Sequence, residues 1–277
     1  MMRTVFALTR TPYDSYTDYL VLARRAWKDC CFINEIKMSE PIIYIVSPMN
    51  GEFRPHIDNH RNEAKKCKIL WWNLERPPRD ENHERHKRDV KELLNRYVDY
   101  MVVSDKWFKN TYYKEFGDKI QYCPMGIDKA LCEDPWKEGH SQHSFAHMSY
   151  VWGRRGILNS LPNTLGNCWG DERKRGLLRT KFMVNVHQDQ YGVIEPLRFA
   201  LAVSHGLPII TEWSHNLFPY GDAVIATDYG QIVSVANKCA NDNYAKYAEM
   251  ARRAYDKMLN QYGFVKCVKE MCDKLPM

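Results

Sequence analysis

The stretch from Tyr191 to Thr211 constrains the fold most, because it reads as a polar loop, a short helix and a buried strand in direct succession. Pro196 suits the first helical position, where its missing N–H is not needed, so we expect Glu195 at the N-cap. Gly206 is expected to end the helix after roughly 9–11 residues. Because an apolar strand also precedes the loop, the segment predicts a βαβ unit, whose loops gather ligands at the carboxyl ends of parallel strands.

Glu195 and Arg198 lie one turn apart at the expected start of this helix. The backbone N–H groups of a helix start favour phosphate, a guanidinium binds phosphate through two hydrogen bonds, and a carboxylate accepts the hydroxyl groups of a ribose or hexose. The pair therefore indicates a site for a nucleotide or a sugar. The simpler alternative is that Glu195 only caps the helix and pairs with Arg198 on the surface.

Strands and helices alternate along the chain, which predicts two α/β sheets rather than a helical bundle. The expected strands are 4–8, 42–47, 68–73, 100–104, 120–123, 145–149, 182–187, 207–211 and 224–227. The expected helices are 17–28, 79–96, 106–116, 154–161, 171–178, 196–205 and 229–240, with two more between 242 and 275. A polar, aperiodic run at 129–143 predicts a linker between two domains, and 277 residues suffice for two cores.

The composition is typical of a soluble globular protein, with 44% hydrophobic and 27% charged residues. No apolar run approaches the roughly 20 residues of a membrane span. We therefore expect a cytoplasmic protein without integral membrane association. Nine cysteines without a Cys-x-x-Cys pair predict free thiols. The net charge of +6 permits a nucleic-acid partner and equally suits an enzyme that holds a nucleoside diphosphate.

Arg154 and Arg155 follow Gly153 at an expected turn from strand to helix. A diphosphate there would meet both a helix start and guanidinium groups, whereas a solvated helix start is the structural alternative. The basic run 173–175 falls on the next helix and is expected to be a solvated face.

His187 and Gln188 follow the strand before the loop and are candidates for contacting the donor sugar or its phosphates. A purely structural histidine is the alternative. Two other groups of histidines, at 83 and 86 and at 140, 143 and 147, lack the carboxylate or cysteine neighbours of a closed zinc site, so we expect no metal.

Loops after the strands of the first half are candidates for the acceptor side of a reaction. Residues 50–56 read as a flexible loop with aromatic and basic groups. The candidate acceptor-binding residues are Asn50, Phe53, Arg54 and Trp72. The candidate general bases toward an acceptor hydroxyl are His56, Glu75 and Asp105, which the sequence does not rank.

Four pieces of the chain occur in an order that resembles one family. They are CPMGID at 123–128, GRR at 153–155, NVHQ at 185–188, and the run from EPLR to GLPIIT at 195–211. This order resembles the C-terminal half of GT-B glycosyltransferases, particularly compact enzymes of bacteriophages and bacterial polysaccharide clusters. Many retaining members carry two glutamates around this helix, but Leu201 stands where the second would fall if Gly206 is the anchor. We therefore expect Glu195 to take the role of the first of these glutamates, of the second, or of both.

The resemblance implies an α/β GT-B fold, with two Rossmann-like domains facing each other across a cleft and C-terminal helices crossing back. Residues 1–128 would then form the acceptor domain, 129–143 the linker, and 144–277 the nucleotide-sugar domain. It further implies a retaining hexosyltransferase that uses a UDP-sugar, without a tightly bound cofactor or an obligate metal. The residues implied at the donor are Arg154, Arg155, His187, Gln188, Glu195 and Arg198, with Glu195 also a catalytic candidate.

The acceptor remains open between two classes. A 5-hydroxymethylpyrimidine base in duplex DNA, as phage enzymes of this architecture use, suits the basic charge and the aromatic loops. The alternative is a surface polysaccharide or glycolipid, for which the basic and apolar segment 19–28 could lie on a membrane. A third possibility is a non-catalytic module that binds nucleic acid, which only the missing second glutamate supports.

Overall fold

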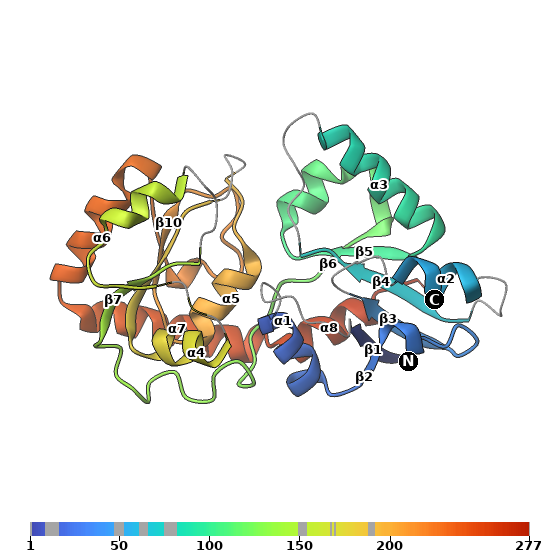
Figure 1. Ribbon diagram of the computed structural model, residues 1–277, viewed down its shortest axis with the longest axis horizontal. Helices are drawn as coiled ribbons and strands as arrows, with labels where there is room; N and C mark the ends of the chain where they lie inside the picture. The colour runs from blue at the N-terminus through green and yellow to red at the C-terminus, as the bar shows by residue number, and fades with distance from the viewer. Residues whose placement is uncertain are drawn as a thin grey trace. The chain divides into compact units, whose positions relative to one another are not determined.

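The computed structural model of the chain describes residues 2–8, 17–46, 53–60, 66–74, 82–148, 154–166, 168, 170–187 and 192–276. These residues form an α/β protein with two parallel sheets, one of six strands and one of five (Figure 1). The chain divides into two compact units. Unit 1 holds Met1–Pro124 and Cys267–Met277, and unit 2 holds Met125–Lys266. The predicted architecture of two α/β sheets is confirmed.

The sheet of unit 1 has the strand order β2-β1-β3-β4-β5-β6, with every neighbouring pair parallel. Its strands are β1 (Arg3–Leu8), β2 (Cys30–Phe32), β3 (Ile42–Val46), β4 (Lys68–Trp72), β5 (Tyr100–Val103) and β6 (Ile120–Tyr122). All residues of β3 and β5 are buried, as in parallel strands covered on both faces. The sequence pattern predicts all of these strands except β2, because this three-residue edge strand is too short to show a period.

The helices of unit 1 depart more from the expectation. They are α1 (Thr17–Val21), the π-helical η2 (Leu22–Trp27), the short η3 (Ile33–Glu35), α2 (Phe53–His60), α3 (Asn82–Arg96), the π-helical η4 (Phe108–Tyr112) and η5 (Lys114–Lys119). The expectation of a loop over 50–56 is wrong from residue 53 onward, where α2 begins, and the residues before it lie outside the described ranges. The helix expected over 106–116 is broken into η4 and η5.

The sheet of unit 2 has the order β11-β10-β9-β7-β8, again with parallel pairs throughout. Its strands are β7 (His143–Ala146), β8 (Thr164–Leu165), β9 (Thr180–Asn185), β10 (Ile209–Glu212) and β11 (Val224–Thr227). The chain leaves β7 for β8 on one side and then returns to β9 on the other. The topological switch point of this sheet, where ligands of such folds bind, therefore lies between the carboxyl ends of β7 and β9.

The helices of unit 2 cover both faces of this sheet (Figure 1). They are η6 (Arg154–Ser160), α4 (Gly170–Leu178), α5 (Pro196–Ser204), η7 (Gly221–Ala223), η8 (Tyr229–Gln231), α6 (Ile232–Asn241) and α7 (Tyr244–Gln261). The last helix, α8 (Phe264–Asp273), belongs to unit 1 from Cys267 onward. Phe182 and Val184 of β9 pack in one core with residues of η6 and α6. Because successive side chains of a strand face opposite sides, Met183 and Asn185 face the side of α5.

Residues 129–143, expected as a linker, lie within unit 2. Trp136 packs so closely on Gly206 that a Cβ atom added at Gly206 would approach the indole ring to 2.6 Å. The guanidinium of Arg252 on α7 lies over the same indole, 4.7 Å from its ring centroid. Gly206 itself has a φ of 67° and follows the end of α5, as the sequence predicts.

All nine cysteines are free thiols, which confirms the expectation from their spacing. Burial is the main reason why the pKa of Cys31 rises to about 12 and that of Cys272 to about 11, so these thiols are protonated at neutral pH. Within the described part of the chain, no helix combines the length and the apolar character needed to cross a bilayer.

Candidate functional site

The start of α5 lies at the carboxyl edge of the second sheet, and Glu195 occupies its N-cap with extended backbone angles. The Glu195 carboxylate does not cap the helix. Instead, Oε2 accepts a hydrogen bond of 2.9 Å from Nδ2 of Asn185, and Oε1 lies 3.4 Å from Nη1 of Arg198. The side chains of Glu195 and Arg198 are only 9% and 14% exposed. The alternative of a surface cap and a surface ion pair is therefore wrong.

Asn185 holds this arrangement together from the last position of β9. Its Nδ2 donates to Glu195 and lies 3.2 Å from Oγ1 of Thr211, while its Oδ1 accepts from Nη1 of Arg198 at 3.3 Å. One amide thus bridges a carboxylate, a hydroxyl and a guanidinium, using both of its hydrogen-bonding ends. Because Asn185 is 2% exposed and sits in a paired strand, this bridge is rigid.

His187 follows two residues later and is 1% exposed. Its Nδ1 lies 3.4 Å from Oε2 of Glu195, and its Nε2 lies 2.8 Å from the hydroxyl of Ser214. Its backbone N–H donates to Oε1 of Glu212 at 2.8 Å. Carboxylate, imidazole and hydroxyl therefore form a continuous line, and the imidazole is oriented from both sides.

We call Asn185, His187, Glu195, Arg198, Thr211, Glu212 and Ser214 the α5 cluster. It combines two carboxylates with one guanidinium in a largely buried place, where charges have to be paired. Carboxylates accept the hydroxyl groups of sugars, and a guanidinium beside a helix start favours phosphate. The cluster is therefore suited to a ligand that carries both hydroxyl groups and an anionic group.

The sequence pattern indicated His187, Glu195 and Arg198, and the structure brings these three together. The sequence pattern did not indicate the remaining members of the cluster as site residues. Asn185 is the one with a visible signal, because it is a polar residue inside the apolar strand FMVNV. Thr211, Glu212 and Ser214 reach the cluster only through the pairing of β10 with β9, which a single sequence does not reveal.

The candidates on the acceptor side occupy different environments in unit 1. Trp72 is fully buried, and its indole N–H donates to the Ser104 hydroxyl, so it belongs to the core and offers no surface to an acceptor. Asp105 is 1% exposed and accepts from the backbone N–H of Trp107, which makes it a cap of the following turn.

Two other acceptor-side candidates lie on α2. The ring of His56 is partly buried, with Nε2 at 3.1 Å from the Ile36 carbonyl oxygen. Arg54 is exposed on the same helix and lies over the Tyr97 ring. Asn50, Glu75 and Gln188 lie outside the described residues, as do the side chains of Phe53, Arg154 and Arg155.

The histidines at 83 and 86 contact aromatic side chains. The rings of His83 and Tyr112 are 4.7 Å apart, and Nε2 of His86 lies 2.9 Å from the Tyr113 hydroxyl. Burial lowers the pKa of His86, which keeps its ring neutral at neutral pH. Among the residues that the structure describes, no three His, Cys, Asp or Glu side chains are grouped as a metal site would require.

Comparison with solved structures places the fold among known ones. HepE of Anabaena in complex with UDP-glucose superposes with a TM-score of 0.62 at 10% identity, covering 99% of both chains. TarM superposes with a TM-score of 0.62 at 12% identity, over 91% of this chain and 57% of TarM. The DNA modifying enzyme β-glucosyltransferase superposes with a TM-score of 0.56 at 8% identity, over 98% of this chain and 100% of that enzyme.

No protein-family model matches the sequence, and no curated protein sequence matches it significantly. The assignment therefore depends on three-dimensional structure, and two observations agree. The chain forms two parallel α/β sheets, and its likeness to each of these three proteins extends over more than nine-tenths of its length. The chain has the fold of the GT-B glycosyltransferases.

Proposed function

We propose that the protein is a glycosyltransferase that moves a sugar from a nucleotide sugar, a UDP-sugar, to a hydroxyl acceptor. The observation that carries the proposal is the α5 cluster, in which Asn185 joins Glu195 and Arg198 beside the switch point of the second sheet. HepE, whose fold is similar to that of this chain over 99% of both chains, was crystallised with UDP-glucose. A sugar nucleotide supplies the hydroxyl and phosphate groups that this cluster is suited to bind.

The roles of the side chains follow from their chemistry. Glu195 accepts hydroxyl groups of the ribose or of the sugar, because its carboxylate is held in place by Asn185 and Arg198. Arg198 and the positive end of α5 stabilise the charge that develops on the leaving diphosphate. This stabilisation needs no obligate metal ion. From the family resemblance we propose that the anomeric configuration is retained.

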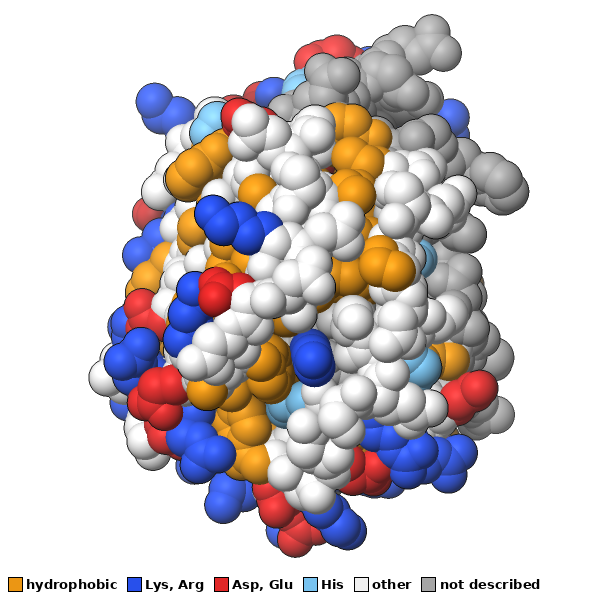
Figure 2. Space-filling model, turned by 90° about the vertical axis from the view of Figure 1, so that its left-hand side faces the viewer, with side chains coloured by type: hydrophobic (Ala, Val, Ile, Leu, Met, Phe, Trp, Pro, Cys, Tyr) orange, Lys and Arg blue, Asp and Glu red, His pale blue; other side chains and the backbone are white. Residues whose placement is uncertain are grey.

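For the acceptor we propose a 5-hydroxymethylpyrimidine base in DNA. The support is the net charge of +6 together with the likeness to a DNA modifying glucosyltransferase. On the face of unit 2 that Figure 2 shows, basic and acidic side chains are interspersed, so this face is not the one expected to hold a duplex. Arg54 and Lys106, both exposed in unit 1, are the proposed contacts to DNA phosphates.

The alternative acceptor, a glycolipid at a membrane, loses the feature that favoured it. Leu20, Leu22 and Ala23 are buried in unit 1, so these side chains are not available to a bilayer. The exposed residues of this segment are all basic: Arg24, Arg25 and Lys28.

The test is an incubation with a panel of sugar nucleotides in EDTA, with hydroxymethylated duplex, unmodified duplex or free glycans, read by mass spectrometry. We expect a sugar to be transferred from a UDP-sugar to the hydroxymethylated duplex. With an α-linked donor, NMR of the product should show an α-linked sugar, because the configuration is retained. UDP should also raise the melting temperature in EDTA, because a ligand that binds only the native state stabilises it. Transfer to glycans alone would refute the DNA acceptor, and the absence of any sugar-nucleotide binding would refute the enzyme.

A second experiment tests the DNA contacts by fluorescence anisotropy across a salt series. Arg54→Gln and Lys106→Gln should each weaken binding equally for all sequences and reduce the salt slope by about one. Lys238→Gln, at an exposed position on α6, is the matched control and should leave the slope unchanged. Equal slopes for all three variants would exclude these residues as DNA contacts.

A further inference from the structure

Arg173 is a buried arginine at the carboxyl edge of the second sheet. The sequence pattern places it in a basic run on a solvated helix face, but the structure shows it only 5% exposed in the first turn of α4. Its neighbour Arg175, two residues on, is exposed as expected. A guanidinium is rarely buried to this degree, because removing it from water is costly.

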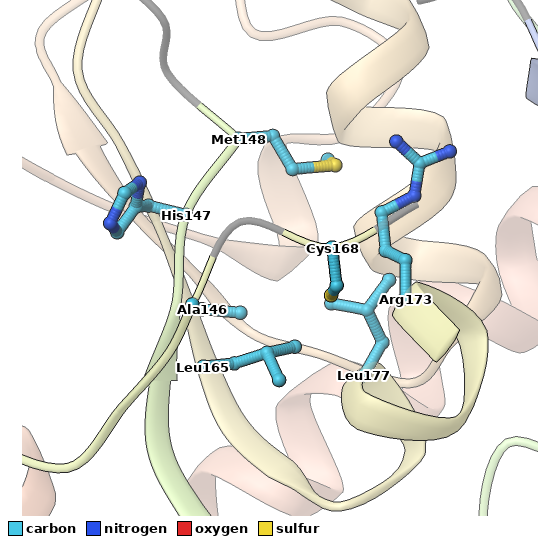
Figure 3. A pocket seen from close by; sticks show the side chains of 8 residues that line it. Ala146, His147, Met148, Leu165, Cys168, Arg173 and Leu177 are labelled. Atoms are coloured by element: carbon cyan, nitrogen blue, oxygen red, sulfur yellow. The ribbon is translucent and has the colours of Figure 1, made fainter. Parts of the chain in front are cut away.

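The Arg173 side chain lines a small pocket with about 230 Å³ of empty space, its opening included. The other lining residues are Ala146, His147, Met148, Leu165, Gly166, Cys168 and Leu177. Figure 3 shows the guanidinium extending from α4 past Cys168 to the level of Met148, whereas the His147 ring points away from the pocket. The pocket is therefore mainly apolar, with one cation at its side.

Charges of both signs act on this pocket: burial and then the Glu172 carboxylate raise the pKa of the Cys168 thiol, which lines it, whereas Arg173 lowers that pKa. The ring of His205, fully buried in unit 2, has its pKa lowered to about 4, first by burial and then also by Lys174 and Arg173. The acidic residues of the same helix, Asp171 and Glu172, are exposed to solvent. An anion that entered the pocket would gain the attraction of the Arg173 guanidinium, which is itself largely buried.

The pocket also borders the α5 cluster. Ala146, the last residue of β7, and the two residues after it line the pocket, while Asn185 ends β9. β7 and β9 are directly paired, and paired strands lie about 4.8 Å apart. Arg173 and the α5 cluster therefore border the same switch point.

We propose that Arg173 binds a phosphate group of the nucleoside diphosphate moiety of the donor in this pocket. The inference rests on the proposed function, which it extends by a second cation besides Arg198. An arginine suits this task, because its planar guanidinium matches two phosphate oxygens at once. Glu195 in the α5 cluster then accepts hydrogen bonds from the hydroxyl groups of the ribose or sugar, and Arg173 binds the negatively charged phosphate.

The test compares Arg173→Gln with Arg175→Gln, which removes an exposed cation from the same helix. Isothermal titration calorimetry with UDP should show binding weakened about 10- to 100-fold for Arg173→Gln and unchanged for the control. Uridine, which lacks the diphosphate, should bind both variants as it binds the wild type. Arg173→Lys, which keeps the charge but not the two-pronged geometry, should give an intermediate affinity for UDP. It also serves if Arg173→Gln fails to fold, which thermal melting without ligand reports.

The outcomes separate the two proposals. If the wild type binds UDP and both Arg173 variants bind it equally well, the Arg173 inference is refuted and the proposed function stands. An equal loss of uridine and UDP affinity would also refute it, because it would show a structural role. If the wild type binds neither UDP nor any sugar nucleotide, the proposed function itself fails.

Discussion

Replacing Glu195 by alanine removes both oxygens on which the α5 cluster is centred. Asn185 Nδ2 would lose its partner at 2.9 Å, although Oγ1 of Thr211 remains within 3.2 Å of it. Arg198, whose side chain is 14% exposed, would lose its carboxylate, and so would the His187 imidazole at 3.4 Å. We therefore expect a loss of stability as well as a loss of activity.

The magnitude follows from the burial of these groups. Breaking a buried ion pair by removing one partner costs about 3–5 kcal/mol. The hydrogen bonds to Asn185 and His187 belong to the same network, so their losses of about 1–3 kcal/mol each do not simply add. We expect Glu195→Ala to lower the free energy of unfolding by about 3–5 kcal/mol, and the melting temperature by roughly 6–20 °C.

Glu195→Gln separates stability from function. The glutamine keeps the size of the side chain and one acceptor oxygen for Asn185 but removes the charge opposite Arg198. We expect it to cost about 1–3 kcal/mol of stability, less than alanine, and yet to reduce sugar transfer at least tenfold, by the loss of a charge-assisted contact worth about 1.5–3 kcal/mol.

The assay is thermal and urea unfolding followed by circular dichroism, together with transfer rates on the same preparations. Glu249→Ala, at an exposed position on α7, is the control and should shift the free energy of unfolding by less than about 0.5 kcal/mol. A Glu195→Ala melting temperature equal to that of the control would show that the contacts of the carboxylate carry no energy. Normal transfer by Glu195→Gln would remove this residue from the donor site.

Three further predictions concern the stability of unit 2. His205 has its pKa lowered by burial from 6.5 to about 4, so the unfolded state binds the proton first and stability is lost as the pH falls from 6.5 towards 4. The loss of unfolding free energy amounts to about 3 kcal/mol, and urea titrations should show it in the wild type and not in His205→Gln. Equal pH dependence of the unfolding free energy in the two proteins would contradict this prediction. Gly206→Ala should lower the free energy of unfolding by about 2–4 kcal/mol, because φ is 67° and the added Cβ would lie 2.6 Å from the Trp136 ring. The control is Gly230→Ala, whose added Cβ would have nothing within 4 Å, and which should change urea unfolding little. Tyr220→Phe should cost about 1–2 kcal/mol in the same assay, because the buried hydroxyl lies within hydrogen-bonding distance of two backbone carbonyl groups; no change would mean that these bonds are replaced.

The βαβ unit around α5 was predictable because its signals are local. Pro196 sits at the first helical position, Glu195 occupies the N-cap, and Gly206 follows the helix end with a positive φ. Proline suits the first helical position and glycine suits the positive φ, so a single residue marks each end of the helix. The role of the Glu195 side chain was less certain from sequence, since a capping carboxylate and a carboxylate turned into a site have the same spacing.

The remaining members of the site depend on contacts between distant parts of the chain. Asn185 meets Thr211 only because β9 pairs with β10, and the burial of Arg173 depends on the strands beside α4. The sequence of the basic run 173–175 does not show which of its three residues is buried and which are exposed to solvent. Helix α2, which begins inside the loop expected over 50–56, was missed because it is too short for a helical period to be distinct.

The last helix adds a constraint on the order of folding. Unit 2 is one continuous stretch of the chain, whereas unit 1 consists of Met1–Pro124 and Cys267–Met277. In the closing segment, Cys267, Val268 and Met271 are buried. During synthesis, which proceeds from the N-terminus, unit 1 cannot bury these side chains until the segment after unit 2 has been made, whereas all of unit 2 is complete before that segment. The part of unit 1 that is made before unit 2 therefore has to wait for the segment that is made after it.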